Sequence, residues 1–200
     1  LSTLSVCSAS EICVPENISS KSSYTVFFTN NACNFQKNVY LILNKPKGYV
    51  SAVEDNVYPP VTDLVSEFAF AKLFPVGRLD VDTTGTLLLT NDGDLCHNML
   101  SPKKHVDKTY SVEVDGVICQ TLIEKFKQGI MLDGELTLPA ELVILDDNHA
   151  ELTIHQGKFH QVKRMFKAFN LNVIKLDRKS FGFLNCDGLD EGEYRLLNSE

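Results

Sequence analysis

"FPVGRLDVDTTGTLLLTND", residues 74–92, places a polar turn between two apolar segments of the chain. Residues 86–90 and the apolar residues at the start of the stretch both read as short strands. Arg78, Asp80 and Asp82 lie between them. One interpretation is a turn aspartate that only caps backbone N–H groups. Because a sheet gives a loop a rigid base, the other is a functional site with the Asp80 carboxylate as nucleophile or base.

Composition indicates one globular domain, or a modest domain with a small appendage. The 200 residues are 44% hydrophobic and 22% charged, which is ordinary for a soluble chain. No apolar run approaches the roughly 18 residues that a membrane span needs. The first residues, LSTLSVCSAS, lack the basic start and apolar segment of a secretory signal. We therefore expect a cytoplasmic monomer without a membrane partner.

Cysteine residues are spread widely along the chain. They are Cys7, Cys13, Cys33, Cys96, Cys119 and Cys186. Their spacing is irregular and includes no C-x-x-C pair, and a chain of this length forms a core without disulfides. We expect reduced thiols, as in cytosolic proteins. A zinc site needs ligands that are closer in sequence, so no metal is expected.

Charge is distributed unevenly over the sequence. The formal net charge is −7, which taken alone argues against a nucleic-acid partner. Acidic residues, however, gather at 146–147 and 187–193. Basic residues form three clusters, namely Lys45 with Lys47; Lys103, Lys104, His105 and Lys108; and Lys158, His160, Lys163, Arg164 and Lys167. An acidic protein can still present a basic surface if the fold brings such clusters together.

Two segments of the chain differ in composition and periodicity. Residues 1–37 contain eight serines and show no regular periodicity, so we expect a poorly specified, partly disordered lead-in with one strand at 24–29. Within residues 38–200, periodicity predicts strands at 39–43, 73–76, 86–90, 109–114, 141–145, 151–154, 172–176 and 194–197. It predicts helices at 94–100, 121–127 and 158–169. This pattern predicts an α+β fold, with a mixed, largely antiparallel central sheet flanked by a few helices.

The predicted helix at 158–169 has two stripes. The apolar stripe is Phe159, Val162, Phe166 and Phe169. The adjacent basic stripe is His160, Lys163, Arg164 and Lys167. Lys163 lies nearest the apolar border, so we expect a half-buried cation with an anionic partner, for which Asp80 is a candidate. A solvated basic face is the alternative.

Tyr110 lies in the predicted strand TYSVEV, at residues 109–114. A strand tyrosine is usually a core or interface residue. Its ring can also stack on a nucleobase, because such stacking tolerates any base. In that interpretation the preceding segment, SPKKHVDK, contacts phosphates through its lysines, Lys103, Lys104 and Lys108.

Three motifs in order, GRLDVDTTGTLLLTNDG, SPKKHVDKTY and GKFHQVKRMF, resemble the pseudouridine synthases of the bacterial ribosomal small-subunit type. The resemblance covers residues 39–197, with NKPKGYVSA near its start and GEYRLL near its end. It implies an isomerase that converts a specific uridine of ribosomal RNA to pseudouridine, on free RNA or on an assembling subunit. It also implies that no cofactor or metal is needed.

The resemblance assigns roles to individual residues. Asp80 of GRLD would attack the target nucleotide, at the ribose C1′ or at the uracil ring. Tyr110 would pack against the flipped base, and Lys163 would pair with Asp80. Arg78 would hold the place of the extruded nucleotide. The other basic residues expected to contact RNA are Lys103, Lys104, Lys108, His160, Arg164 and Lys167.

Two features depart from the family pattern. Many members carry an N-terminal basic RNA-binding domain of roughly 60 residues, whereas residues 1–37 are short, neutral and rich in serine. This puts RNA affinity and target choice in doubt, but not the chemistry. Thr86 stands where the family usually has leucine, and we expect only a small change in packing there.

Three alternatives stay open at this point. A large-subunit rRNA site is the first, and a catalytically silent RNA-binding or ribosome-assembly factor is the second. Retention of Asp80, Tyr110 and Lys163 together argues against a silent protein. A glycoside hydrolase is the third and most distant, since it would need Asp82 as a second carboxylate at a suitable separation from Asp80.

Overall fold

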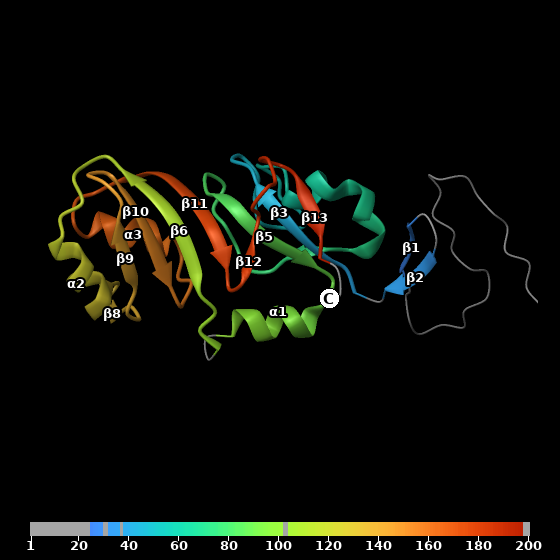
Figure 1. The fold of residues 1–200 in the computed structure, drawn as a ribbon, viewed down its shortest axis with the longest axis horizontal. Coiled ribbons are helices and arrows are strands. Elements are labelled where there is room, and N and C mark those ends of the chain that lie inside the picture. The colour runs from blue at the N-terminus through green and yellow to red at the C-terminus, as the bar shows by residue number, and fades with distance from the viewer. Residues whose placement is uncertain (1–24, 30–31, 37, 102–103, 198–200) are drawn as a thin grey trace, which may run out of the picture.

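A computed structural model describes residues 25–29, 32–36, 38–101 and 104–197 (Figure 1). One long, twisted sheet with helices packed on both faces forms the centre of this part of the chain. The fold is α+β with a mixed, mostly antiparallel sheet, as predicted. Within the described ranges, no helix is both long enough and apolar enough to span a bilayer.

The central sheet contains nine strands within the described residues. They are β3 (Tyr40–Lys45), β4 (Phe74–Pro75), β5 (Thr84–Thr90), β6 (Lys108–Val114), β9 (Glu141–Ile144), β10 (His149–Ile154), β11 (Val173–Phe181), β12 (Leu184–Asn185) and β13 (Tyr194–Leu196). The order across the sheet is β13-β3-β5-β11-β6-β10-β9, with β4 paired to β5 and β12 to β11. The β5–β11 pair is parallel, and it joins the two halves of the sheet.

Strand β5, at the middle of the sheet, is buried along its whole length. Leu87 and Leu89 belong to the larger core, together with residues of the 3-10 helix η1 (Val61–Ala71) and of the helices α2 (Thr121–Gln128) and α3 (Gln161–Lys167). Leu88 belongs to a second, smaller core, against which the helix α1 (Gly93–Leu100) packs. A strand with both faces covered needs apolar residues at consecutive positions, and the Leu87–Leu89 run supplies them.

The parallel contact between β5 and β11 depends on two residues of β5. Gly85 has φ +99°, and a Cβ added there would collide with the backbone of Arg178 in β11. Glycine therefore permits the close approach of the two strands. The Thr86 hydroxyl is buried and donates a hydrogen bond to the Lys179 carbonyl (2.8 Å), so this departure from the family pattern links the same two strands.

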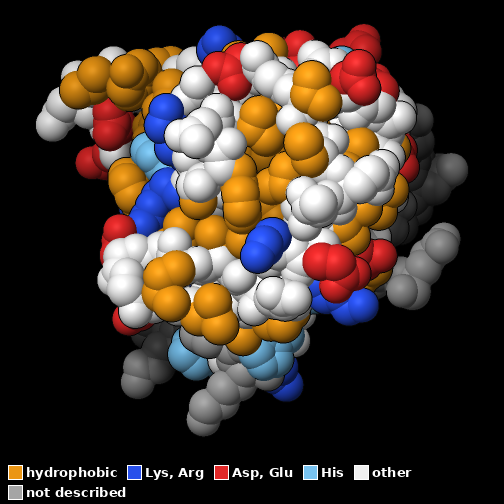
Figure 2. Space-filling model, turned by 90° about the vertical axis from the view of Figure 1, so that its left-hand side faces the viewer, with side chains coloured by type: hydrophobic (Ala, Val, Ile, Leu, Met, Phe, Trp, Pro, Cys, Tyr) orange, Lys and Arg blue, Asp and Glu red, His pale blue; other side chains and the backbone are white. Residues whose placement is uncertain are grey.

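Small elements complete the described structure. Strands β1 (Thr25–Thr29) and β2 (Ala32–Gln36) form a separate antiparallel pair, which agrees with the strand expected at 24–29 and adds a partner that was not predicted. The expectation for residues 1–24 lies outside the described residues. Strands β7 (Met131–Leu132) and β8 (Glu135–Leu136) form a hairpin. Figure 2 views this end of the molecule, where hydrophobic side chains are exposed on the surface.

One sequence prediction about α3 is wrong. The helix begins at Gln161 instead of residue 158, because His160 adopts a left-handed conformation with φ +48°. The Gln161 side chain accepts a hydrogen bond from the Lys158 N–H (2.9 Å), which closes a turn before the helix. Phe159 is therefore outside the helix and 75% exposed, whereas Val162 and Phe166 are buried as expected. The rest of the apolar stripe holds, with Phe169 partly buried against the core.

Candidate active site

The loop between β4 and β5 carries Asp80, and buried hydrogen bonds fix its backbone. The Ser51 hydroxyl donates to the Leu79 carbonyl (2.9 Å) and accepts from the Leu79 N–H (3.0 Å). After Asp80 the loop closes in a turn, in which the Thr83 N–H donates to the Asp80 carbonyl (3.1 Å). Ser51 is itself buried, so water does not compete for these bonds. The position of Asp80 is therefore set by the scaffold.

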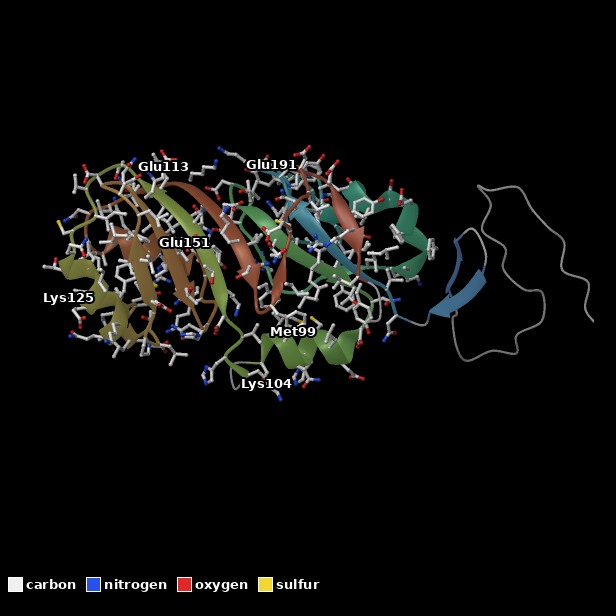
Figure 3. The ribbon with its side chains drawn as sticks, in the orientation of Figure 1. Met99, Lys104, Glu113, Lys125, Glu151 and Glu191 are labelled. Carbon is white, nitrogen blue, oxygen red and sulfur yellow. The ribbon has the colours of Figure 1, made fainter. Side chains whose placement is uncertain are left out.

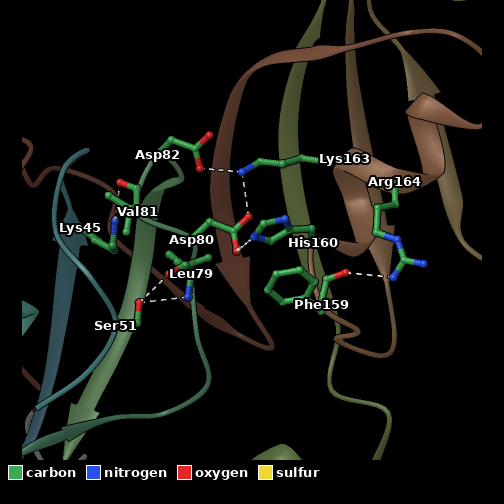
Figure 4. Close-up of polar contacts among 10 residues, drawn as sticks. All are labelled: Lys45, Ser51, Leu79, Asp80, Val81, Asp82, Phe159, His160, Lys163 and Arg164. Carbon is green, nitrogen blue, oxygen red and sulfur yellow. Dashed lines mark hydrogen bonds and ion pairs between the residues drawn. The ribbon is translucent and has the colours of Figure 1, made fainter. Parts of the chain in front are cut away.

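Lys45 at the end of β3 supports the same loop from the side of Val81 (Figure 4). Its side chain is completely buried, and its ammonium donates to the carbonyls of Thr83 (2.8 Å), Pro46 (3.0 Å) and Val81 (3.4 Å). Burial lowers the pKa of Lys45 to about 8. In the sequence this lysine reads as part of a basic cluster with Lys47, and the structure corrects that interpretation. Lys45 holds backbone and does not face solvent.

Asp80, Asp82 and Lys163 form a compact charged group above the loop (Figure 4). The Lys163 Nζ lies 2.8 Å from Asp80 Oδ2 and 2.5 Å from Asp82 Oδ1. The predicted proximity of Lys163 to Asp80 is confirmed. The Asp80 side chain is 27% exposed and that of Asp82 is 57% exposed, so Asp80 is the more enclosed carboxylate. Its second oxygen, Oδ1, lies 3.5 Å from the His160 Nε2.

The ion pairs shift the pKa values of two groups. Burial by itself would lower the pKa of Lys163, but hydrogen bonds and charges from Asp80 and Asp82 raise it above its ordinary value. For Asp82, burial opposes ionisation, while the hydrogen bond and charge of Lys163 lower the carboxyl pKa. Both groups are therefore charged at neutral pH, and Lys163 is shared between two carboxylates.

Helix α3 positions Lys163 through its buried face. Val162, Met165 and Phe166 belong to the larger core, and the Phe166 ring contacts that of Phe126 in α2 with centroids 5.1 Å apart. These contacts fix the rotation of a helix only seven residues long. Lys163 follows Val162 on the adjacent face and reaches toward the loop of Asp80. The border position inferred from the sequence is correct.

Tyr110 lies in β6, where it pairs in register with Arg178 of β11 and Leu152 of β10. Its side chain is buried in the larger core. Arg178 is also buried; its Nε donates to the Thr86 carbonyl (2.8 Å), and its guanidinium lies over the Phe181 ring. The role of Tyr110 as a stacking surface for the target base stays a prediction.

The remaining basic residues are not all gathered around Asp80. Arg78 is exposed two residues away from it, and Lys104 is exposed next to α1, at the opposite edge of the molecule from Glu191 in the view of Figure 3. Lys108 is half-buried, with its ammonium on the Val106 carbonyl (2.7 Å) and over the Phe181 ring. Burial lowers its pKa.

Two further basic residues of α3 bind partners other than Asp80. Arg164 pairs with Asp133 (2.5 Å), and Lys167 donates to the Asn172 side chain (2.8 Å). Lys103 lies outside the described residues. Of the four basic residues predicted to form the stripe at 160–167, the structure thus brings only His160 and Lys163 next to Asp80.

Sequence reasoning missed two supporting residues, Lys45 and Ser51. Both lie in the segment NKPKGYVSA, in which the sequence indicated only a basic cluster of Lys45 and Lys47 and a family resemblance. The available signal for Lys45 was strand alternation. Lys45 lies two positions after the buried Leu43 in β3, so its side chain points to the same face of the sheet. No group of three His, Cys, Asp or Glu residues with the geometry of a metal site occurs within the described ranges.

Comparisons with known proteins identify the family of this chain. Residues 39–168 match the family model described as RNA pseudouridylate synthase. Over 164 residues the chain is 42% identical to the ribosomal small subunit pseudouridine synthase A of Escherichia coli (strain K12), covering 80% of this chain and 71% of that protein. The protein of the same name from Pasteurella multocida (strain Pm70) is 45% identical, with the same coverage.

A solved structure supports the same conclusion. The crystal structure of a pseudouridylate synthase superimposes with a TM-score of 0.76 at 43% identity, covering 80% of this chain and 70% of that one. The family match includes the loop of Asp80, Tyr110 and Lys163. The chain belongs to the RNA pseudouridylate synthase family.

Proposed function

We propose that this protein isomerises a specific uridine of small-subunit ribosomal RNA to pseudouridine, with Asp80 as the catalytic nucleophile. The observation that carries the proposal is the Asp80 carboxylate, mounted on a scaffold-fixed loop and bound by the Lys163 ammonium at 2.8 Å. One oxygen of the fixed carboxylate is held by a cation, and the other, in a partly exposed side chain, lies 3.5 Å from the His160 ring. This arrangement suits attack on a nucleotide.

The reaction is an isomerisation, so its atoms balance without a co-reactant. Asp80 attacks the ribose C1′ or the uracil ring, and the N1–C1′ glycosidic bond breaks. The uracil rotates, C5 bonds to C1′, and the bond to Asp80 breaks, which restores the free carboxylate. The hydrogen of C5 leaves to solvent, and N1 gains a proton. Lys163 holds the Asp80 carboxylate in position, and no cofactor is assigned a step.

Substrate binding is assigned to residues around this centre. Tyr110 packs against the extruded uracil, and Arg78 holds its place in the RNA. Extrusion costs a few kcal/mol of unstacking, which stacking and phosphate contacts must offset. Lys103, Lys104, Lys108, His160, Arg164 and Lys167 are the proposed RNA contacts. Lys108, Arg164 and Lys167 must release their present partners to make them.

The names of the relatives favour small-subunit RNA as the target. A large-subunit site is the second candidate. We propose ribosomal RNA, free or in an assembling subunit, as the partner of a cytoplasmic monomer. A silent RNA-binding factor is disfavoured, because a carboxylate beside phosphates weakens RNA binding and serves only catalysis.

The test is to map pseudouridines in ribosomal RNA from cells with and without the gene. The proposal predicts that one pseudouridine of the small-subunit RNA disappears with the gene and returns when the gene is restored. A lost site in the large-subunit RNA would support the second candidate. Identical maps would overturn both.

A further inference from the structure

We infer that Phe159 and His160 form a second base-binding surface, which stacks an unpaired base of the RNA beside the target uridine. The inference rests on the proposed function, because it takes the substrate to be RNA. It deepens that function by adding a subsite for a neighbouring nucleotide next to Asp80.

The geometry of the two rings carries the inference (Figure 4). The Phe159 and His160 rings stack with centroids 3.8 Å apart and planes inclined by 18°. The His160 Nε2 lies 3.5 Å from Asp80 Oδ1, so the stack begins at the catalytic carboxylate. Both rings extend from their backbone toward the loop that carries Asp80. With 75% of Phe159 exposed, one face of its ring remains open to a ligand.

The local backbone holds the Phe159 ring out of the core. His160 has a left-handed conformation, which is uncommon for a residue other than glycine. The helix therefore begins only after His160, and Phe159 lies outside it. The Arg164 Nη1 donates to the Phe159 carbonyl (3.3 Å), while its Nη2 pairs with Asp133. Phe159 belongs to neither hydrophobic core of the described residues, so core packing does not account for it.

The surroundings select a nucleobase as the ligand. An exposed aromatic face binds planar apolar rings. Lys158 and Arg164, within five residues of Phe159, hold exposed ion pairs with Glu135 and Asp133, which the phosphates of RNA can replace. The target uracil is engaged at Asp80, so the base on Phe159 is a neighbour. Extruding the target leaves that neighbour without one stacking partner, and the Phe159 ring can replace it.

The experiment measures RNA affinity and turnover for three variants, Phe159→Ala, Phe159→Trp and Phe183→Ala. The probe is an unmodified transcript of the small-subunit ribosomal RNA. Phe183 is the control, since it is 90% exposed on the turn between β11 and β12. We expect Phe159→Ala to weaken binding by about 5- to 150-fold, the range for one lost base–aromatic stack. We expect Phe159→Trp to bind at least as tightly as the wild type, and Phe183→Ala to match it.

A salt series separates stacking from charge. Loss of a stack lowers affinity by the same factor at each salt concentration, so the log–log lines for Phe159→Ala and the wild type should be parallel. Unchanged affinity of Phe159→Ala, an equal loss in Phe183→Ala, or a loss that tryptophan does not restore would overturn the inference while the wild type still forms pseudouridine. If the wild type forms none in either ribosomal RNA, the proposed function fails and this inference fails with it.

Discussion

Two walls of the site meet where Lys163 binds the Asp80 carboxylate, and different interactions hold them in place. The sheet wall, residues 79–84, is fixed by Ser51 and Lys45 through buried hydrogen bonds to its backbone. The helix wall, residues 157–164, is fixed at its outer side by exposed ion pairs, Lys158 with Glu135 and Arg164 with Asp133. Exposed ion pairs contribute about 0–1 kcal/mol and weaken in salt.

The difference separates two tasks of the site. The proposed nucleophile, Asp80, belongs to the wall whose backbone is fixed by buried hydrogen bonds before RNA binds, which is the arrangement that catalysis requires. The residues proposed to contact RNA belong mostly to the wall whose outer contacts are easily exchanged. Phosphates can therefore replace Asp133 or Glu135 as partners of the basic side chains at little cost in stability.

The largest effect is expected at the carboxylate of the sheet wall. Asp80→Asn should fold normally and form no detectable pseudouridine, because an amide keeps the shape but cannot attack. Asp82→Asn is the matched control. It removes the other carboxylate on Lys163 and should retain substantial activity. Single-turnover assays with saturating enzyme check both variants, and an inactive Asp82→Asn with an active Asp80→Asn would transfer the role to Asp82.

Lys163 joins the two walls, and its loss should rank second. Lys163→Met keeps the packing of the side-chain stem but removes the cation that positions Asp80. We expect turnover to fall on the order of 100-fold, as when one positioned charged donor is lost, with RNA affinity reduced much less. Lys163→Arg should recover part of the activity. Equal turnover of Lys163→Met and the wild type would show that the pair is only structural.

Burial of Lys45 against the sheet wall should make the free energy of unfolding depend on pH. The pKa of Lys45 is about 8 in the folded protein against an ordinary value of 10.5, so the unfolded chain binds more protons between these values. The free energy of unfolding should therefore rise with pH until about pH 10.5. Between pH 7 and pH 9.5 the expected rise is about 2 kcal/mol. Urea unfolding of the wild type and Lys45→Met measures the difference. Parallel pH profiles for the two proteins would contradict the assigned burial cost.

The smallest effect is expected on the helix wall. Arg164→Ala breaks the exposed pair with Asp133 and should lower the free energy of unfolding by less than about 1 kcal/mol. RNA affinity should fall a few-fold, with turnover at saturation unchanged. Lys167→Ala, on the same helix, is a comparison with a neutral partner, Asn172. A loss of turnover in Arg164→Ala equal to that in Lys163→Met would erase the distinction between the walls.

Local patterns predicted the strands of the sheet and the burial of Val162 and Phe166, because each follows from spacing within one segment. The approach of Lys163 to Asp80 joins two motifs 83 positions apart, and it was predicted from the border position of Lys163 and from the family resemblance. The start of α3 was missed, since it depends on the positive φ of His160 and on a side-chain bond from Gln161 that helical periodicity does not encode.

Long-range contacts explain the other omissions. The carbonyl partners of Lys45 come mainly from residues 36 and 38 positions away, so its burial is invisible in a local window. The 3-10 helix η1 has non-helical backbone angles at Val65 and Phe68, which blur its period. The parallel β5–β11 pairing joins residues 93 positions apart, and only the finished sheet specifies it.

Isomerisation of uridine by Asp80 is tested most directly by measuring release of the C5 hydrogen of uridine. Because the new glycosidic bond forms at C5, each turnover frees that hydrogen to solvent. Purified protein would be mixed with unmodified small-subunit and large-subunit transcripts that carry tritium at C5 of uridine. We expect release of one tritium per small-subunit RNA from the wild type and none from Asp80→Asn. No release from either transcript with folded wild-type protein, or equal release with Asp80→Asn, would contradict it.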